Sequence, residues 1–474
     1  MLDFSEFSSS KKALEFFEEF SKIPRGSGNT AAIADYLVKF ANQRNLEVIR
    51  DSADNVIIRK AATAGYEGKP GIIFQGHTDI VALKTPDCPI NMDKEGLKLY
   101  RDGDFLRAEG TTLGADDGVA MAYALAILDA NDIEHPDFEA VFTSDEEVGL
   151  LGATALDTSN IKGKMLINID SDDEGIFTVG CAGGARVDVT LPVSTKTHIG
   201  KIFTLTVKGL RGGHSGVEID KNRANAIKVV ATVLSKFEDV RLGMSTAGSA
   251  DNAIPSDAVV TFCSKTPIME MASILDDIRE SLPEEESEVK FKIDLNVIGS
   301  GKMLSVEDSK NIIDLILDMP NGVTRMSEDI EGLVETSLNM GILNLSRKGF
   351  ELTISVRSAK GAEKAKLLDT IKATAESHGA SISVRGEYPA WEYKKDSHLR
   401  DVMCKVYSEM YGKDAKVVTI HAGLECGIFS DKIEGLDCVS IGPDNYDIHT
   451  PDERLSLSSF ERVYKYLLNV LKNI

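Results

Sequence analysis

Histidine and carboxylate residues gather in five short motifs whose chemistry suits metal binding. In chain order they are GHTD (76–79), GADDG (114–118), SDEEVG (144–149), NIDSDDE (168–174) and DIHTPDE (447–453). Imidazole nitrogen combined with carboxylate oxygen is typical of zinc-like ions, whereas calcium and magnesium prefer oxygen alone. Three carboxylates and one hydroxide would also balance the charge of two divalent ions. The motifs therefore indicate a pair of metal ions.

Each motif taken alone has an ordinary interpretation. An isolated histidine is most often a core or surface residue. The aspartates of GADDG suit the first position of a helix, and three adjacent acids usually form a solvated turn. The spacing of His77 and Asp79 adds one specific expectation, because the Asp79 carboxylate can accept the second imidazole N–H and fix the tautomer that binds metal.

Short apolar runs precede three of the motifs and predict buried strands at 71–77, 138–147 and 165–172. Each run turns abruptly polar at its carboxyl end. A strongly apolar helix is expected at 118–130, between the first two strands. This order predicts an α/β sandwich with a mostly parallel sheet. Ligands of such sheets collect beyond the carboxyl ends of the strands, so the motifs should meet on one rim.

The pattern changes in the middle of the chain. From about residue 186 to 388 the strands are amphipathic and alternate with amphipathic helices, which predicts an α+β domain with one sheet face packed on helices. The arrangement occurs roughly twice and hints at a duplication. We therefore expect an α/β/α catalytic domain in two pieces, 1–183 and 390–474, interrupted by an inserted α+β lid domain at 184–389.

Composition excludes several classes of partner. The chain has 75 acidic and 53 basic residues and a net charge of −22, so a nucleic-acid backbone would be repelled. No stretch approaches the roughly 20 apolar residues of a membrane span, and the N-terminal residues lack a basic segment before an apolar run. Six cysteines without a CxxC pair suit a reducing compartment. We expect a cytoplasmic protein that binds neither nucleic acid nor membrane.

Jointly, the ordered motifs GHTD, GADDG, DEEVG, NIDS, GGHSG (212–216), NAIP (252–255) and IHTPDE resemble the dinuclear zinc peptidases, a family of carboxypeptidases, aminoacylases and dipeptidases. The longer runs GTTLGADDGVAMA, TSDEEVGLLGA, HAGLECG and SIGPDNYDIHTPDERL are similar to its bacterial aminoacyl-histidine dipeptidase subgroup. The resemblance covers nearly the whole chain and is weakest at about 265–350. It implies a metal-dependent hydrolase of dipeptides, in particular Xaa-His dipeptides such as β-alanyl-histidine. Two zinc ions are the implied cofactor, and similar sites also accept manganese or cobalt.

The resemblance implies five metal ligands: Asp116 bridging both ions, His77 and Asp170 on one ion, and Glu147 and His449 on the other. Glu146, beside a ligand but not itself bound, would be the general base. Asp79 would orient His77. In this family the peptide bond after the bridging aspartate is often cis, so a cis bond is expected between Asp116 and Asp117.

The inserted domain would supply substrate contacts. The resemblance gives His214 the task of hydrogen-bonding the oxyanion, and Asn252 and Arg357 that of binding substrate. A loop histidine and a strand-surface charge are the plainer interpretations of His214 and Arg357. Glu425 could receive the substrate ammonium group, or it could be a buried structural carboxylate. The adjacent glycines Gly183 and Gly184 lie where the chain passes from the catalytic domain to the lid, a position that suits a hinge.

Two other functions compete with the dipeptidase. A deacylase of N-acyl amino acids or a carboxypeptidase would use the same scaffold, although the HAGLECG segment and the long lid argue against both. The retention of Glu146 and every expected ligand speaks against the remote alternative, a binding homologue without turnover. A duplicated lid could replace that of a partner subunit, whereas family members with such a lid also dimerise, so a homodimer stays open.

Overall fold

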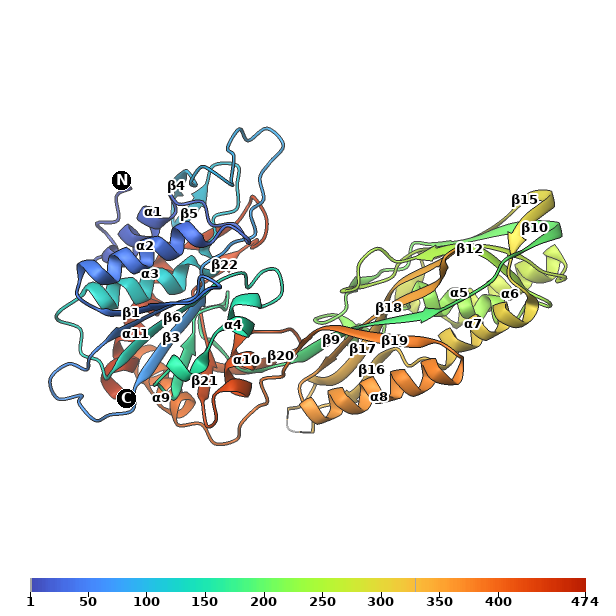
Figure 1. The fold of residues 1–474 in the computed structure, drawn as a ribbon. Coiled ribbons are helices and arrows are strands. Elements are labelled where there is room, and N and C mark those ends of the chain that lie inside the picture. Colours follow the sequence, from blue (N-terminus) through green and yellow to red (C-terminus); the bar gives the residue numbers. More distant parts are fainter. Residues whose placement is uncertain (1, 329) are drawn as a thin grey trace. The chain divides into compact units, whose positions relative to one another are not determined.

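The computed structural model describes residues 2–328 and 330–474, and the chain divides into two compact units. Unit 1 comprises Met1–Cys181, Tyr393–Thr419 and Leu424–Ile474, and unit 2 comprises Ala182–Glu392 and Ile420–Gly423. Figure 1 shows the blue N-terminal and red C-terminal segments together in unit 1. The four residues 420–423 differ from our expectation of one uninterrupted segment, 390–474. The Ala182 N–H donates to the Ile420 carbonyl at 3.1 Å, which ties this short segment to the start of unit 2.

Unit 1 contains seven α-helices within the described ranges. They are α1 (Lys11–Phe20), α2 (Ala31–Gln43), α3 (Ala115–Asp129), α4 (Leu151–Ala155), α9 (His398–Tyr411), α10 (Glu425–Lys432) and α11 (Leu457–Asn473). A 3₁₀ turn, η1, covers Thr158–Asn160. Over residues 2–328 and 330–474, no helix combines the length and apolar character that crossing a membrane requires.

The main sheet of unit 1 has eight strands in the order β1-β2-β6-β3-β7-β21-β8-β20. Their bounds are β1 (Glu47–Arg50), β2 (Val56–Lys60), β3 (Ile72–His77), β6 (Phe138–Thr143), β7 (Met165–Asn168), β8 (Ile176–Cys181), β20 (Lys416–Ile420) and β21 (Asp437–Ser440). A small second sheet joins β4 (Leu99–Asp102), β5 (Phe105–Ala108), β22 (Asn445–Tyr446) and β23 (Arg454–Ser456).

The four central strands, β6, β3, β7 and β21, run parallel, and antiparallel pairs flank them on both sides. Helices lie on both faces of this sheet (Figure 1), so the expected α/β class is confirmed. His77 at the end of β3 is in register with Thr143 at the end of β6, and Gln75 with Asn168 at the end of β7. Because these strands are parallel, the motifs that follow them emerge on one rim of the sheet.

Helix α3 is apolar on every side, which is typical of a helix that is buried all round. Its residues Val119 to Leu128 are all buried, packed against β3 and α1. The helix lies very close to β3 at Gly76. A Cβ built there would lie 2.1 Å from Oδ2 of Asp117 and 2.2 Å from Cβ of Ala120. The absence of a side chain at Gly76 lets the helix start lie directly against the strand end.

We expect Gly76→Ala to lower the free energy of unfolding by about 3 kcal/mol, because a methyl group forced into this contact must displace helix or strand. Urea denaturation followed by circular dichroism measures the loss. Gly71→Ala is the matched control just before the same strand, since its Cβ would meet nothing closer than 3.4 Å. Equal stability of the two variants would contradict the close contact at Gly76.

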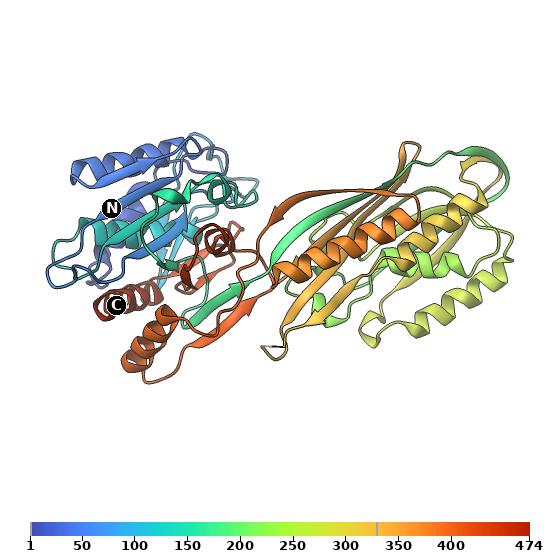
Figure 2. The same cartoon turned by 60° about the horizontal axis from the view of Figure 1, so that its bottom comes forward.

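Unit 2 contains one large antiparallel sheet with helices along one face (Figure 2). Its principal strands are β9 (Gly183–Leu191), β10 (Lys196–Lys208), β12 (Arg241–Ala247), β14 (Ala258–Cys263), β15 (Lys290–Met303), β16 (Gly322–Met326), β17 (Val334–Ser346), β18 (Gly349–Ser358) and β19 (Ser381–Tyr388). The helices are α5 (Ala226–Ser235), α6 (Ile268–Ser281), α7 (Val306–Asp318) and α8 (Gly361–Ser377), with 3₁₀ turns η2 (Ile219–Lys221) and η3 (Glu284–Glu286). Two further strands, β11 (Gly213–His214) and β13 (Ala253–Ile254), form a separate antiparallel pair.

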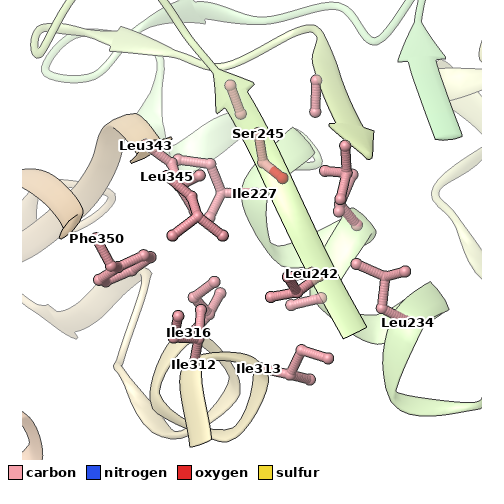
Figure 3. A pocket seen from close by; sticks show the side chains of 15 residues that line it. Ile227, Leu234, Leu242, Ser245, Ile312, Ile313, Ile316, Leu343, Leu345 and Phe350 are labelled. Atoms are coloured by element: carbon pink, nitrogen blue, oxygen red, sulfur yellow. The ribbon is translucent and has the colours of Figure 1, made fainter. Parts of the chain in front are cut away.

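A small cavity lies in the core of unit 2, between the sheet and helices α5 and α7 (Figure 3). Its volume is about 30 Å³, and its lining is aliphatic apart from Phe350 and Ser245. A hollow of this size could hold one water molecule, but a water needs two or more polar partners. The cavity is therefore a packing gap of the core and offers no chemistry.

Candidate metal centre

The rim of unit 1 collects the five expected ligands from five separate segments. His77 is the last residue of β3, and Asp170 follows β7 by two residues. Glu147 follows β6, Asp116 lies in the first turn of α3, and His449 lies in the loop between β22 and β23. The side chains of His77, Asp116, Glu147 and Asp170 are largely buried, whereas His449 is 46% exposed. Four of the expected ligands thus lie in the interior, and the fifth comes from a surface loop.

Asp116 lies between the two histidines. Its Oδ1 is 2.9 Å from Nε2 of His77, and its Oδ2 is 3.1 Å from Nε2 of His449. Glu147 Oε1 lies 3.0 Å from the same nitrogen of His449, and Asp170 Oδ1 lies 3.7 Å from Nε2 of His77. The donor atoms of His77, Asp116 and Asp170 all lie within 4.8 Å of one another, as do those of Asp116, Glu147 and His449. Two donor sets that share one carboxylate fit two adjacent cations.

The charges of the centre also fit cations. Burial opposes ionisation of Asp116, but hydrogen bonds from His449 and His77 outweigh it and lower the Asp116 pKa. Burial raises the pKa of Asp170 to about 6. Hydrogen bonds to Asp116 and Glu147 raise the pKa of His449 to about 10. In His77, hydrogen bonds to Asp116 and Asp170 overcome burial and raise the pKa. The carboxylates that raise the pKa of both imidazoles make the centre acidic, and bound metal ions would neutralise that negative charge.

Glu146 lies beside the two donor sets, within 4.8 Å of donor atoms of His77 and Glu147. Burial raises its pKa well above the usual value. The loop that carries it is held by Asp79, whose Oδ1 accepts the Glu146 N–H at 3.0 Å and whose Oδ2 accepts the Ser27 hydroxyl at 2.8 Å. A half-buried carboxyl group with a raised pKa is suited to take up and release a proton.

The geometry of Asp79 differs in detail from the expectation. Nδ1 of His77 lies 3.0 Å from the backbone carbonyl of Asp79 and 3.4 Å from its Oδ1. The carbonyl is the nearer acceptor because the carboxylate is turned toward the amides of Glu146 and Glu147. Asp79 thus contacts the imidazole through its backbone carbonyl and, less closely, through its carboxylate, which also positions the acidic loop.

The peptide bond between Asp116 and Asp117 is cis, as the resemblance implied. Asp117 received no role from the sequence, although it belongs to the GADDG motif. Its Oδ2 accepts the His77 N–H at 3.3 Å, and its Oδ1 accepts the Ala120 N–H at 3.1 Å. Asp117 is buried and joins the end of β3 to the start of α3.

In unit 2 the structure brings His214 and Asn252 together. His214 in β11 is in register with Ala253 of β13, the residue after Asn252. Nδ1 of His214 accepts the backbone N–H groups of Gly216 and Val217, each at 3.2 Å. Burial, assisted by a nearby guanidinium, lowers the His214 pKa. The ring is therefore neutral with its proton on Nε2, which makes that atom a hydrogen-bond donor.

Arg357 belongs to a second group of polar side chains in unit 2. It lies opposite Ser337 in the sheet and donates from Nη1 to the Tyr388 hydroxyl at 3.3 Å. Ser337 Oγ lies 2.7 Å from Nε2 of His421. Within the described ranges, the buried Nε of Arg357 and Nδ1 of His421 have no hydrogen-bond partner. A guanidinium with an unused donor suits an anionic ligand group. Sequence reasoning left His421 without a role, because nothing in its motif placed it beside Arg357.

His421 should make the stability of unit 2 depend on pH. Burial, assisted by Arg357, lowers its pKa from 6.5 to about 4. Between these two pH values the unfolded chain therefore binds a proton at His421 that the folded chain does not bind. The contribution of His421 to folding stability is complete above pH 6.5 and is lost as the pH falls toward 4. We expect about 2 kcal/mol less stability from this group at pH 5 than at pH 7. Fluorescence of the single tryptophan, Trp391 in unit 2, can follow urea unfolding. His421→Gln should lack this part of the pH dependence, and an unchanged dependence would contradict the assignment.

Glu425 lies in the interior of unit 1, fully buried at the start of α10. Its Oε2 accepts hydrogen bonds from Gln75 Nε2 at 2.5 Å and from Thr143 Oγ1 at 2.7 Å. Burial raises its pKa to about 7. These contacts favour the second of its two interpretations, a buried structural carboxylate that ties α10 to β3 and β6.

The two adjoining donor sets on the rim of an α/β unit fit a metallopeptidase, and the chain belongs to peptidase family M20/M25/M40, whose family model matches residues 73–473. The family expected from the motifs is therefore confirmed. Over 469 residues the chain is 33% identical to the cytosol non-specific dipeptidase of Escherichia coli (strain K12), and the match covers 97% of each chain.

Solved structures agree with this assignment. The aminoacylhistidine dipeptidase from Vibrio alginolyticus superposes with a TM-score of 0.91 at 33% identity, covering 99% of both chains. The aminopeptidase PepT from Bacillus cereus ATCC 10987 superposes with a TM-score of 0.57 at 17% identity over 98% of both chains, a likeness of fold alone.

Proposed function

We propose that this chain is a dipeptidase that uses two divalent metal ions, and that Xaa-His dipeptides, β-alanyl-histidine included, are among its substrates. The observation that carries the proposal is the shared carboxylate Asp116 between two donor sets, with the half-buried acid Glu146 beside them. The names of the two relatives at 33% identity support dipeptides as the substrate class. The name of the Escherichia coli relative also supports a cytoplasmic location, which we propose for this chain.

The donor sets support zinc as the metal. His77 with Asp116 and Asp170 would hold one ion, and Glu147 with Asp116 and His449 the other. Imidazole and carboxylate donors in sets of three leave coordination positions for water and substrate, as catalytic zinc sites require. When bound, two such ions would lower the pKa of a water molecule toward about 7 and polarise the substrate carbonyl.

In this proposal Glu146 handles the proton. Its carboxylate accepts a proton from the attacking water and later delivers it to the leaving amine, which prevents expulsion of an unstable amide anion. The Asp79 carboxylate supports this role because it holds the backbone N–H groups of both Glu146 and Glu147. The base and the neighbouring ligand are therefore fixed by one side chain.

The residues of unit 2 would bind and polarise the substrate. Nε2–H of His214 would donate to the oxygen that becomes negative during attack on the carbonyl. Arg357 would bind the free carboxylate of a dipeptide, and Asn252 a backbone group of the substrate. The support for these roles is the tautomer of His214 and the unused guanidinium donor of Arg357.

The experiment is hydrolysis of β-alanyl-histidine and several α-dipeptides by the purified chain, before and after chelation, with zinc, manganese or cobalt added back. We expect activity to vanish on chelation and to return with metal, and the ratio between substrates measures the preference for histidine. If metal-replete protein cleaves no free dipeptide, the proposal is wrong. N-acylated amino acids tested on the same sample would then reveal a deacylase or carboxypeptidase.

A further inference from the structure

Glu453 receives an unusual set of backbone hydrogen bonds. Its carboxylate is 3% exposed; Oε2 accepts the N–H groups of Leu113 at 2.7 Å and Gly114 at 2.9 Å. Oε1 accepts the N–H of Ala115 at 2.9 Å and, at 3.4 Å, that of Asp116. Gly114 has a left-handed backbone, φ 69°, which lets consecutive amides converge on one anion. Glu453 thus holds the segment that ends in the shared carboxylate.

Arg25 holds the same segment by its carbonyl. Its side chain is 1% exposed, and Nη2 donates to the Gly114 carbonyl at 2.6 Å. Nη1 donates to the carbonyl of Thr78 at 2.8 Å and, at 3.4 Å, to that of Asp79. Burial lowers the pKa of Arg25 to about 10, so it remains a cation at neutral pH. In the part of the chain that the structure describes, this cation forms no direct ion pair, and backbone carbonyls take its hydrogen bonds.

Each of these two residues links a ligand histidine to Asp116. Thr78, bound by Arg25, directly follows His77, and Glu453 belongs to the same loop as His449. We propose that Arg25 and Glu453 are positioning residues of the metal centre. Arg25 fixes the His77 segment against the Asp116 segment, and Glu453 fixes the His449 loop against the same segment. This inference rests on the proposed function, because it assumes that the two donor sets bind metal.

The links matter because Asp116 must meet both donor sets at once. Its two oxygens lie 2.9 Å and 3.1 Å from the imidazoles of His77 and His449. A small rotation of the Asp116 segment would improve one contact only at the expense of the other. Residues that orient metal ligands typically change metal affinity by about 10–100-fold when they are replaced.

Zinc binding by the full-length chain tests the inference. Competition with a chromophoric chelator measures the affinity and the number of zinc ions bound, independently of activity. We expect Glu453→Gln and Arg25→Lys each to weaken zinc binding by about 10–100-fold. Gln loses the charge and one acceptor oxygen, and Lys cannot reach two carbonyl groups in a planar fork. If Glu453→Gln does not fold, Glu453→Asp keeps the charge, shortens the side chain and serves the same comparison.

Double variants test which histidine each residue positions. If Glu453 acts through the His449 loop, Glu453→Gln should weaken the remaining zinc affinity less in a His449→Ala background than in a His77→Ala background. Arg25→Lys should show the opposite order. Equal losses in both backgrounds would overturn this division of roles.

Glu461→Gln is the matched control, because Glu461 is also a buried carboxylate that accepts backbone amides, those of Ser9 at 3.3 Å and Ser10 at 2.8 Å. Its loss should lower the melting temperature of the metal-free protein without changing zinc affinity. Folded Arg25→Lys and Glu453 variants that bind two zinc ions as tightly as the unmodified chain would overturn the inference. If the unmodified chain itself fails to bind two zinc ions, the proposed function is wrong instead.

Discussion

Glu146→Gln should lower kcat for dipeptide hydrolysis by about 10²–10⁴-fold while both metal ions stay bound. Gln has nearly the same shape as Glu but cannot accept the proton of the attacking water. The expected loss falls on kcat because proton transfer occurs in the chemical step and not in substrate binding. Steady-state kinetics gives kcat and KM, and the zinc content of the same sample shows whether the centre is intact.

Two comparisons make this result specific. Glu434→Gln changes an exposed acid of unit 1 and should leave kcat unchanged. His449→Ala, in contrast, should reduce the zinc content as well as the rate, because His449 belongs to a donor set. Near-normal kcat in a Glu146→Gln protein that retains its metal would show that another group is the base.

Asp116→Asn should weaken binding of both metal ions by more than about 100-fold, a larger effect than that expected for a residue that only orients a ligand. The carboxylate meets His77 through one oxygen and His449 through the other, so its loss affects both donor sets. Asn also removes the negative charge that the low pKa of Asp116 provides. Zinc titration of the metal-free protein, with competition by a chelator, measures both affinities.

The number of metal ions whose binding is weakened distinguishes a bridging ligand from one that contacts a single ion. Asp170→Asn should weaken the binding of one ion, since Asp170 belongs only to the donor set with His77. Asp116→Asn should weaken the binding of both ions. Hydrolysis should then fall below detection at metal concentrations that saturate the unmodified chain. An Asp116→Asn protein that binds one ion with native affinity would show that the carboxylate is not shared.

The sequence alone was sufficient for three of the four central strands, β3, β6 and β7, and for the residue types of the expected donor sets. The runs before GHTD and SDEEVG predicted β3 and β6, and the apolar stretch after GADDG predicted α3. These features are local: a buried parallel strand is apolar throughout, and a helix buried all round has no polar face. The resemblance added the family and the five expected ligands, because its motifs are local too.

Other features depended on contacts between distant segments. The Asp79 carboxylate holds the loop of Glu146 and contacts the His77 imidazole less closely than its own carbonyl does. Glu425 is enclosed by Gln75 and Thr143, a burial that the letters HAGLECG do not reveal. A side chain's burial depends on which strands and helices surround it, and this is a property of the assembled sheet.

Arg25 shows most clearly what could not be predicted from the sequence alone. In the sequence it is one cation in a loop rich in helix-breaking residues, without a motif. In the structure it is buried and donates hydrogen bonds to the segments of both His77 and Asp116. Local patterns determined which residues could do chemistry and on which strand ends they lie. Only the tertiary structure decided which backbone groups each buried charge satisfies, because that depends on the packing of segments far apart in the chain.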